Sequence, residues 1–125
     1  MCGIFGYIKN EPCSFAVVQR PLEKLIHSAH SRGKEASGIA ALSTDHRVTL
    51  IKSDLDSKTF LLSKEYAAYV KQLQPQNLIT AIGHSRLATH GSQLMHENNQ
   101  PVVSAKQRLV GVHNGIITNT QLLWQ

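Results

Sequence analysis

The order of the predicted elements indicates a mixed α+β fold for this chain of 125 residues. Strand-like and helix-like segments follow one another as β–α–β–β–α–β–β, and the two strands in the middle are joined by a short turn typical of a hairpin. The hydrophobic content of 42% is ordinary for a globular protein and allows one modest core. We therefore expect a single domain over residues 1–125.

The first part of the chain supplies a strand and a helix. Apolar and polar residues alternate over residues 3–9, which predicts a strand, and residues 10–12 are predicted to form a turn. A helix is predicted to open at Pro21 and to end near Gly33, because glycine commonly ends a helix. The apolar residues at helical spacing are Leu22, Leu25, Ile26 and Ala29.

The middle of the chain predicts a hairpin and a second helix. Residues 37–43 form a short apolar run that is typical of a buried strand, and residues 47–52 return beside it after a turn. A helix is predicted over residues 57–73 and ends before Pro75. Its expected core residues are Phe60, Leu61, Tyr66, Ala67 and Val70.

The last part of the chain predicts two more strands separated by a long loop. Residues 78–84 are apolar and indicate a buried strand, residues 91–101 are typical of a loop, and residues 107–113 predict another strand. A short segment at 116–119 follows. Residues 120–125 have the pattern of a helix start.

Charge and cysteine content argue against several classes of protein. The net charge is +5, and the basic residues are scattered rather than interleaved with aromatic residues, so there is little support for nucleic-acid binding. No apolar run reaches the length of a membrane span and the N-terminus lacks a signal-peptide pattern, which predicts a cytoplasmic protein without a membrane partner. Cys2 and Cys13 have neither disulfide-rich nor zinc-binding spacing, so no metal and no other cofactor is expected.

Cys2 is the residue with the most direct chemical implication. Removal of Met1 would leave a cysteine that carries both a thiol and a free α-amino group. An α-amino group has an ordinary pKa of about 7.7–8.0, so it can take the thiol proton near neutral pH and return it later. The alternative is that Met1 is retained and Cys2 is a small buried residue at the start of a strand.

Asn114 and Gly115 follow a predicted strand and allow two interpretations. An Asn-Gly pair is a common two-residue hairpin turn. The apolar residues Ile116 and Ile117 after it indicate a buried turn instead, in which the Asn114 side-chain amide and the Gly115 N–H point at one position. Two such donors form an oxyanion hole.

Arg86 follows the predicted buried strand 78–84 and has small residues around it. A surface cation is one interpretation, but this setting suits a bidentate grip on a carboxylate. Thr89 and His90 can supply neutral hydrogen bonds beside it. His84 is interpreted as a structural histidine.

These motifs together resemble the glutaminase domain of class II glutamine amidotransferases, in the N-terminal nucleophile hydrolase superfamily. Residues 83–91, with the sequence GHSRLATHG, are most similar to the glucosamine-6-phosphate synthase branch (glutamine–fructose-6-phosphate aminotransferase), although Leu87 occupies a position where that branch usually has tryptophan. The matching segments occur in family order and span nearly the whole chain. They are residues 1–7, 32–33, 37–40, 83–91, 99–101 and 113–117.

The resemblance implies glutamine amide hydrolysis by an N-terminal cysteine. Cys2 is then the nucleophile, and its α-amine is the base and later the acid. Asn114 and the Gly115 N–H stabilise the tetrahedral oxyanion. The reaction passes through a glutamyl thioester, releases ammonia, and needs no metal.

The resemblance also implies the residues that bind the substrate and support the site. Arg86 binds the α-carboxylate of glutamine, with Thr89 and His90 lining the same pocket. Arg32 and Gly33 support the strand of the nucleophile.

The fold implied by the resemblance is an αββα sandwich. We expect it to be incomplete at the C-terminus, because the domain of the family is longer and no Asp or Glu follows Gly115 to bind the substrate amino group. The implied partners are L-glutamine and an acceptor (synthase or isomerase) domain or subunit that passes ammonia to a sugar phosphate, with a homo-oligomer also open. The alternatives are a non-catalytic binding or regulatory module, and a purine- or asparagine-type amidotransferase.

Overall fold

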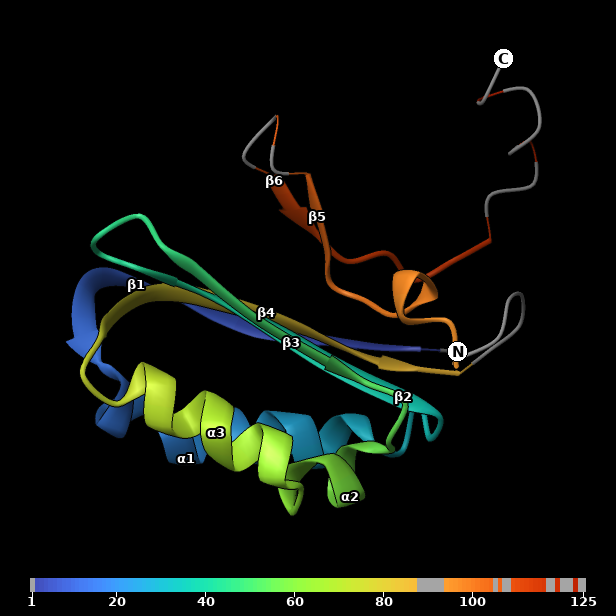
Figure 1. The fold of residues 1–125 in the computed structure, drawn as a ribbon, viewed down its shortest axis with the longest axis horizontal. Coiled ribbons are helices and arrows are strands. Elements are labelled where there is room, and N and C mark those ends of the chain that lie inside the picture. The colour runs from blue at the N-terminus through green and yellow to red at the C-terminus, as the bar shows by residue number, and fades with distance from the viewer. Residues whose placement is uncertain are drawn as a thin grey trace.

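The fold is α+β, as the order of the elements predicts, with three helices on one face of an antiparallel sheet (Figure 1). The structure, a computed structural model, describes residues 2–87, 94–104, 106, 109–116, 119 and 123. Four strands form one sheet in the order β1-β4-β2-β3, and β5 pairs with β6. The elements are β1 (Gly3–Ser14), α1 (Phe15–Ala29), β2 (Ala36–Ser43), β3 (Val48–Ser53), α2 (Ser57–Leu61), α3 (Lys64–Leu73), β4 (Asn77–Arg86), the 3₁₀ turn η1 (His96–Asn98), β5 (Val102–Ser104) and β6 (Leu109–Gly111).

Strand β1 is longer than predicted. The prediction of a turn at residues 10–12 is wrong, because the chain stays extended there and pairs with β4 again at Cys13, after a shift of register beyond Ile8. The predicted alternation before this point is confirmed, since Phe5 and Tyr7 pack against the core.

Helix α1 begins six residues earlier than predicted. The prediction that it opens at Pro21 is wrong, because α1 begins at Phe15 and carries Pro21 on its exposed side. Five buried side chains along one stripe offset the backbone hydrogen bond that a proline removes. These residues are Phe15, Val18, Leu22, Ile26 and Ala29, whereas Leu25, which was predicted to belong to this face, is 38% exposed.

The helix predicted over residues 57–73 is two helices. Ser63 separates them, because its side-chain oxygen accepts a hydrogen bond from the Tyr66 N–H at 3.0 Å and so caps the start of α3. Asp56 caps α2 in the same way. The prediction of Ala67 as a core residue is wrong, since the break in the helix leaves Ala67 on the exposed side of α3.

The C-terminal part contains a strand that the sequence analysis missed. Strand β5 directly follows the predicted loop and has only three residues, too few to show a period. It pairs with β6, which lies within the predicted strand 107–113. The predicted helix start at 120–125 lies outside the described residues, apart from Leu123.

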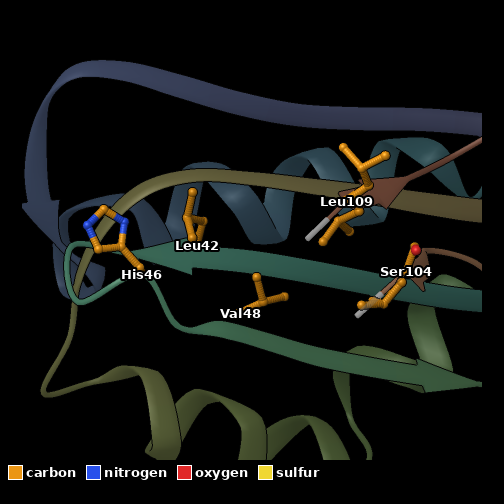
Figure 2. A pocket seen from close by; sticks show the side chains of 7 residues that line it. Leu42, His46, Val48, Ser104 and Leu109 are labelled. Carbon is orange, nitrogen blue, oxygen red and sulfur yellow. The ribbon is translucent and has the colours of Figure 1, made fainter. Parts of the chain in front are cut away.

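The hydrophobic core lies between the helices and one face of the large sheet. Its largest fully buried apolar side chains are Phe15, Phe60, Leu22, Ile26, Ile39, Leu73 and Leu78. The hairpin β5–β6 lies on the other side of this sheet (Figure 1). A hollow of about 610 Å³ beside the hairpin is lined by mainly apolar side chains from β2, β3 and the hairpin (Figure 2). In the described part of the chain, no helix has the length and apolar character needed to cross a membrane.

Candidate active site

Cys2 lies immediately before β1 and beside the end of β4. The pairing of Gly3 with Ser85 brings it next to Leu87. The Leu87 N–H donates to Cys2 Sγ at 3.3 Å, and Sγ lies 3.5 Å from the Leu87 carbonyl oxygen. The thiol is free and half-buried, so it combines a fixed position with access from solvent. A thiolate, the nucleophilic form of cysteine, can accept a hydrogen bond from a backbone N–H that points at its sulfur.

The turn after α1 packs against the ends of β1 and β4. A Cβ on Gly33 would lie 2.4 Å from the Ser85 carbonyl oxygen, so only glycine lets the turn approach β4 this closely. A Cβ on Gly3 would lie 3.0 Å from the Cβ of Arg32, so this arginine lies against the strand that follows Cys2. The structure therefore places Arg32 against the strand that carries the candidate nucleophile and Gly33 against the neighbouring strand β4.

Arg86 is the last residue of β4 and its side chain is buried, with 7% exposure. Its Nη1 donates to Asn99 Oδ1 at 2.9 Å, and Asn99 is 1% exposed. An amide oxygen orients the guanidinium without adding a charge. A guanidinium has five N–H donors in a fixed plane and can bind a carboxylate through two of them. The residues predicted beside it, Thr89 and His90, lie outside the described residues.

Asn114 meets Cys2 although 112 positions separate them in the sequence. The Asn114 Nδ2 donates to the Cys2 carbonyl oxygen at 3.0 Å, so the candidate oxyanion donor lies at the residue that carries the thiol. The prediction of a buried turn here is wrong. Asn114, Gly115 and Ile116 are all exposed, because the described elements leave this segment uncovered.

Gln100 is a residue of the site to which the sequence analysis gave no role. Its Nε2 donates to the His113 carbonyl oxygen at 3.0 Å, and its Oε1 accepts a hydrogen bond from the His113 N–H. The side chain thus holds the peptide immediately before Asn114. The only signal in the sequence was the match of residues 99–101 to the family pattern, which says nothing of this contact.

His84 lies in β4, next to the backbone of His113, and is 1% exposed. Burial lowers the pKa of His84 to about 4, and a hydrogen bond to the His113 backbone partly opposes this shift. Nearby positive charge on Arg86 lowers the pKa further. His84 is therefore neutral at physiological pH.

A chain of buried hydroxyl groups ties the strands of the site together. Ser57 Oγ lies 3.1 Å from Ser37 Oγ and is also hydrogen-bonded to Ser85 Oγ. All three side chains are buried. The chain joins β2, the start of α2 and β4 directly before Arg86, which fixes the end of β4 from the core side.

Comparison with known proteins identifies close relatives of the chain. It is 38% identical over 125 residues to the glutamine–fructose-6-phosphate aminotransferase of Listeria monocytogenes, a match that covers 98% of this chain and 18% of the relative. The enzyme of the same name from Chlamydia muridarum is 37% identical over 123 residues, with 98% and 18% covered. The one from Streptococcus mutans is 38% identical over 124 residues, with 95% and 17% covered. The chain thus spans less than a fifth of the length of these relatives.

The solved structures add information on the fold only. A chain from a complex of the β-clamp processivity factor and the little finger domain of PolIV is similar with a TM-score of 0.52 and 10% identity, over 74% of this chain and 94% of that chain. No family model matches the sequence. From its sequence relatives, the chain belongs to the family of the glutamine–fructose-6-phosphate aminotransferases, as its motifs predicted.

Proposed function

We propose that this chain hydrolyses the side-chain amide of glutamine, with Cys2 as the nucleophile, and releases ammonia for transfer to an acceptor. The observation that supports this most directly is that three groups lie at the same end of the paired strands β1 and β4. Cys2 precedes β1, Arg86 ends β4 and Asn114 follows β6. A thiol, a carboxylate-binding cation and an amide donor are the groups that this reaction requires.

The first half of the reaction forms a thioester. The α-amine of Cys2, exposed by removal of Met1, takes the thiol proton, and Sγ bonds to the amide carbon of glutamine. The carbonyl oxygen becomes an oxyanion, which Asn114 Nδ2 and the Gly115 N–H bind; one such donor typically contributes about 10²–10³ in rate. The carbon–nitrogen bond then breaks, and the nitrogen takes the proton from the amine and leaves as ammonia.

The second half of the reaction restores the enzyme. The same amine takes a proton from water, whose oxygen bonds to the thioester carbon and forms a second oxyanion on the same donors. The carbon–sulfur bond breaks, sulfur regains its proton, and glutamate leaves. Arg86 holds the α-carboxylate throughout, and the Leu87 N–H near Sγ supports the thiolate each time it forms.

The acceptor in this proposal is a sugar phosphate bound by a separate domain or subunit. The support is the name of the relatives, which specifies glutamine as donor and fructose 6-phosphate as acceptor. We also propose that the two sheets of this chain are parts of an αββα sandwich of the N-terminal nucleophile hydrolase type. The helical layer on one face of the large sheet and the hairpin β5–β6 on the other are compatible with that arrangement.

The two cysteines provide a matched test. In protein freed of Met1, Cys2→Ser is expected to abolish glutamate release from glutamine, whereas Cys13→Ser, which removes the other thiol, is expected to retain it. A glutamine-like diazo ketone should alkylate Cys2 and spare Cys13. Wild-type protein without Met1 that neither releases glutamate nor reacts with the diazo ketone would reject the proposal and favour a non-catalytic binding module.

A further inference from the structure

Two neighbouring residues connect the carboxylate side of the site to the oxyanion side. Asn99 accepts a hydrogen bond from Arg86 at 2.9 Å. Gln100 bonds to both the N–H and the carbonyl oxygen of His113, directly before Asn114. The segment between η1 and β5 therefore contacts the two halves of the proposed site through adjacent side chains.

The contact between Gln100 and His113 has the form of a strand pairing. The Gln100 carboxamide presents one acceptor and one donor to His113, as the backbone of a neighbouring strand would. Because the N–H and the carbonyl oxygen of His113 are both hydrogen-bonded to Gln100, the backbone at His113 is restrained in position and in rotation. The following residue, Asn114, is exposed, so its orientation depends on this restraint of the backbone and on its own hydrogen bond to the Cys2 carbonyl oxygen.

Gln100 is itself held by the sheet. A Cβ on Gly38, near the start of β2, would lie 2.1 Å from the Gln100 carbonyl oxygen, so the Gln100 backbone lies directly on this strand. Asn99 and Pro101, on either side, are fully buried. Gln100 thus transmits the fixed geometry of the large sheet to an exposed segment.

We propose that Gln100 is a positioning residue that holds Asn114 and Gly115 in the orientation that binds the oxyanion. This assignment rests on the proposed glutaminase function. Gln100 touches no reacting atom in it and acts through the His113 backbone. Because glutamine in the ground state is held through Arg86, removal of the Gln100 side chain weakens the transition state and leaves substrate binding intact.

The kinetic test separates positioning from general stability. In the full chain without Met1, Gln100→Ala is expected to lower kcat for glutamate release about 10- to 100-fold, with KM changed less than about threefold. Gln100→Glu keeps an acceptor for the His113 N–H but sets a carboxylate against the His113 carbonyl, so it should restore little of kcat. Gln72→Ala, an exposed glutamine on α3, is the matched control and should retain both constants. An unchanged kcat in Gln100→Ala, or a KM that rises as much as kcat falls, overturns the proposal.

Hydrogen exchange distinguishes failure of this inference from failure of the proposed function. In Gln100→Ala, amides at residues 109–116 should exchange faster while those of β2 keep wild-type protection. If the wild-type chain neither releases glutamate nor reacts with the diazo ketone, the proposed function fails. Hydrogen exchange alone then tests whether Gln100 holds residues 109–116 in place. Faster exchange confined to 109–116 supports the hold of Gln100 on this segment. Unchanged exchange there, or loss of protection in β2 as well, overturns it.

Discussion

Replacing Gly38 by alanine is expected to damage the stability of the protein and the geometry of the proposed site together. The added methyl group would meet the carbonyl oxygens of Gln100 at 2.1 Å and Ile51 at 3.1 Å, whereas ordinary contact begins at 3.4 Å. Both atoms belong to the backbone, so the Gln100 backbone has to retreat by about 1.3 Å. Overpacking of this kind costs about 1–3 kcal/mol in the free energy of unfolding.

The displacement has a consequence for the rate as well. A shift of the Gln100 backbone also moves the Gln100 side chain. Its two hydrogen bonds to His113 transmit the shift to the neighbouring residue, Asn114. A misplacement of about 1 Å can cost on the order of 10²-fold in rate. Gly38→Ala should therefore lower kcat for glutamate release about 100-fold.

Urea unfolding followed by circular dichroism measures the first effect, and glutamate release at saturating glutamine measures the second. Gly111→Ala is the matched control, because a Cβ at that glycine meets nothing within 4 Å. Its kcat should equal that of the wild type, and its urea midpoint should not fall, because alanine restricts the unfolded chain more than glycine does. A Gly38→Ala protein with both quantities unchanged would refute the close packing of Gln100 on β2.

Three further predictions concern Arg86, the N-terminus and His84. Asn99→Ala removes the oxygen that orients the Arg86 guanidinium at 2.9 Å, so KM for glutamine should rise about tenfold; an unchanged KM in steady-state kinetics would contradict this. A chain that retains Met1, verified by intact mass, lacks the free α-amine of Cys2 and should release no glutamate; any turnover by that species counts against the assigned base. Burial lowers the pKa of His84 to about 4 in the folded state from its ordinary value of 6.5, so the unfolded state binds the proton first. The free energy of unfolding should fall as the pH decreases from about 6.5 to about 4, and His84→Gln should reduce this dependence in urea titrations; equal slopes would exclude His84 as its source.

The sequence predicted those parts of the fold that depend on local patterns. The alternation that turns Phe5 and Tyr7 toward the core repeats every second residue, and the turn between β2 and β3 has its own composition. The start of α1 was missed because Pro21 is a common first residue of helices. Here, the apolar stripe that begins at Phe15 determines the helix instead.

The candidate site, too, could be predicted from the sequence only where its residues belong to local motifs. Cys2, Arg86 and Asn114 were recognised because each belongs to a motif of contiguous residues. The hydrogen bonds of Asn99 to Arg86 and of Gln100 to His113 each join residues 13 positions apart, and contacts at that separation produce no periodic pattern in the sequence. The exposure of Asn114 could not be predicted from its apolar neighbours, because burial depends on which elements cover a segment.

The ladder between β1 and β4 fixes the position of Cys2 relative to Arg86 along the two strands. Gly3 lies opposite Ser85, so the residues that carry the thiol and the guanidinium are attached to two strands whose offset is fixed by backbone hydrogen bonds. Each residue of an antiparallel ladder advances about 3.4 Å along the strand. A slip of one residue in this register would displace the thiol from the guanidinium by about that distance and turn the side chains of one strand to the other face of the sheet. In the proposed function, binding of one glutamine between Cys2 and Arg86 thus depends on the correct pairing of the two strands.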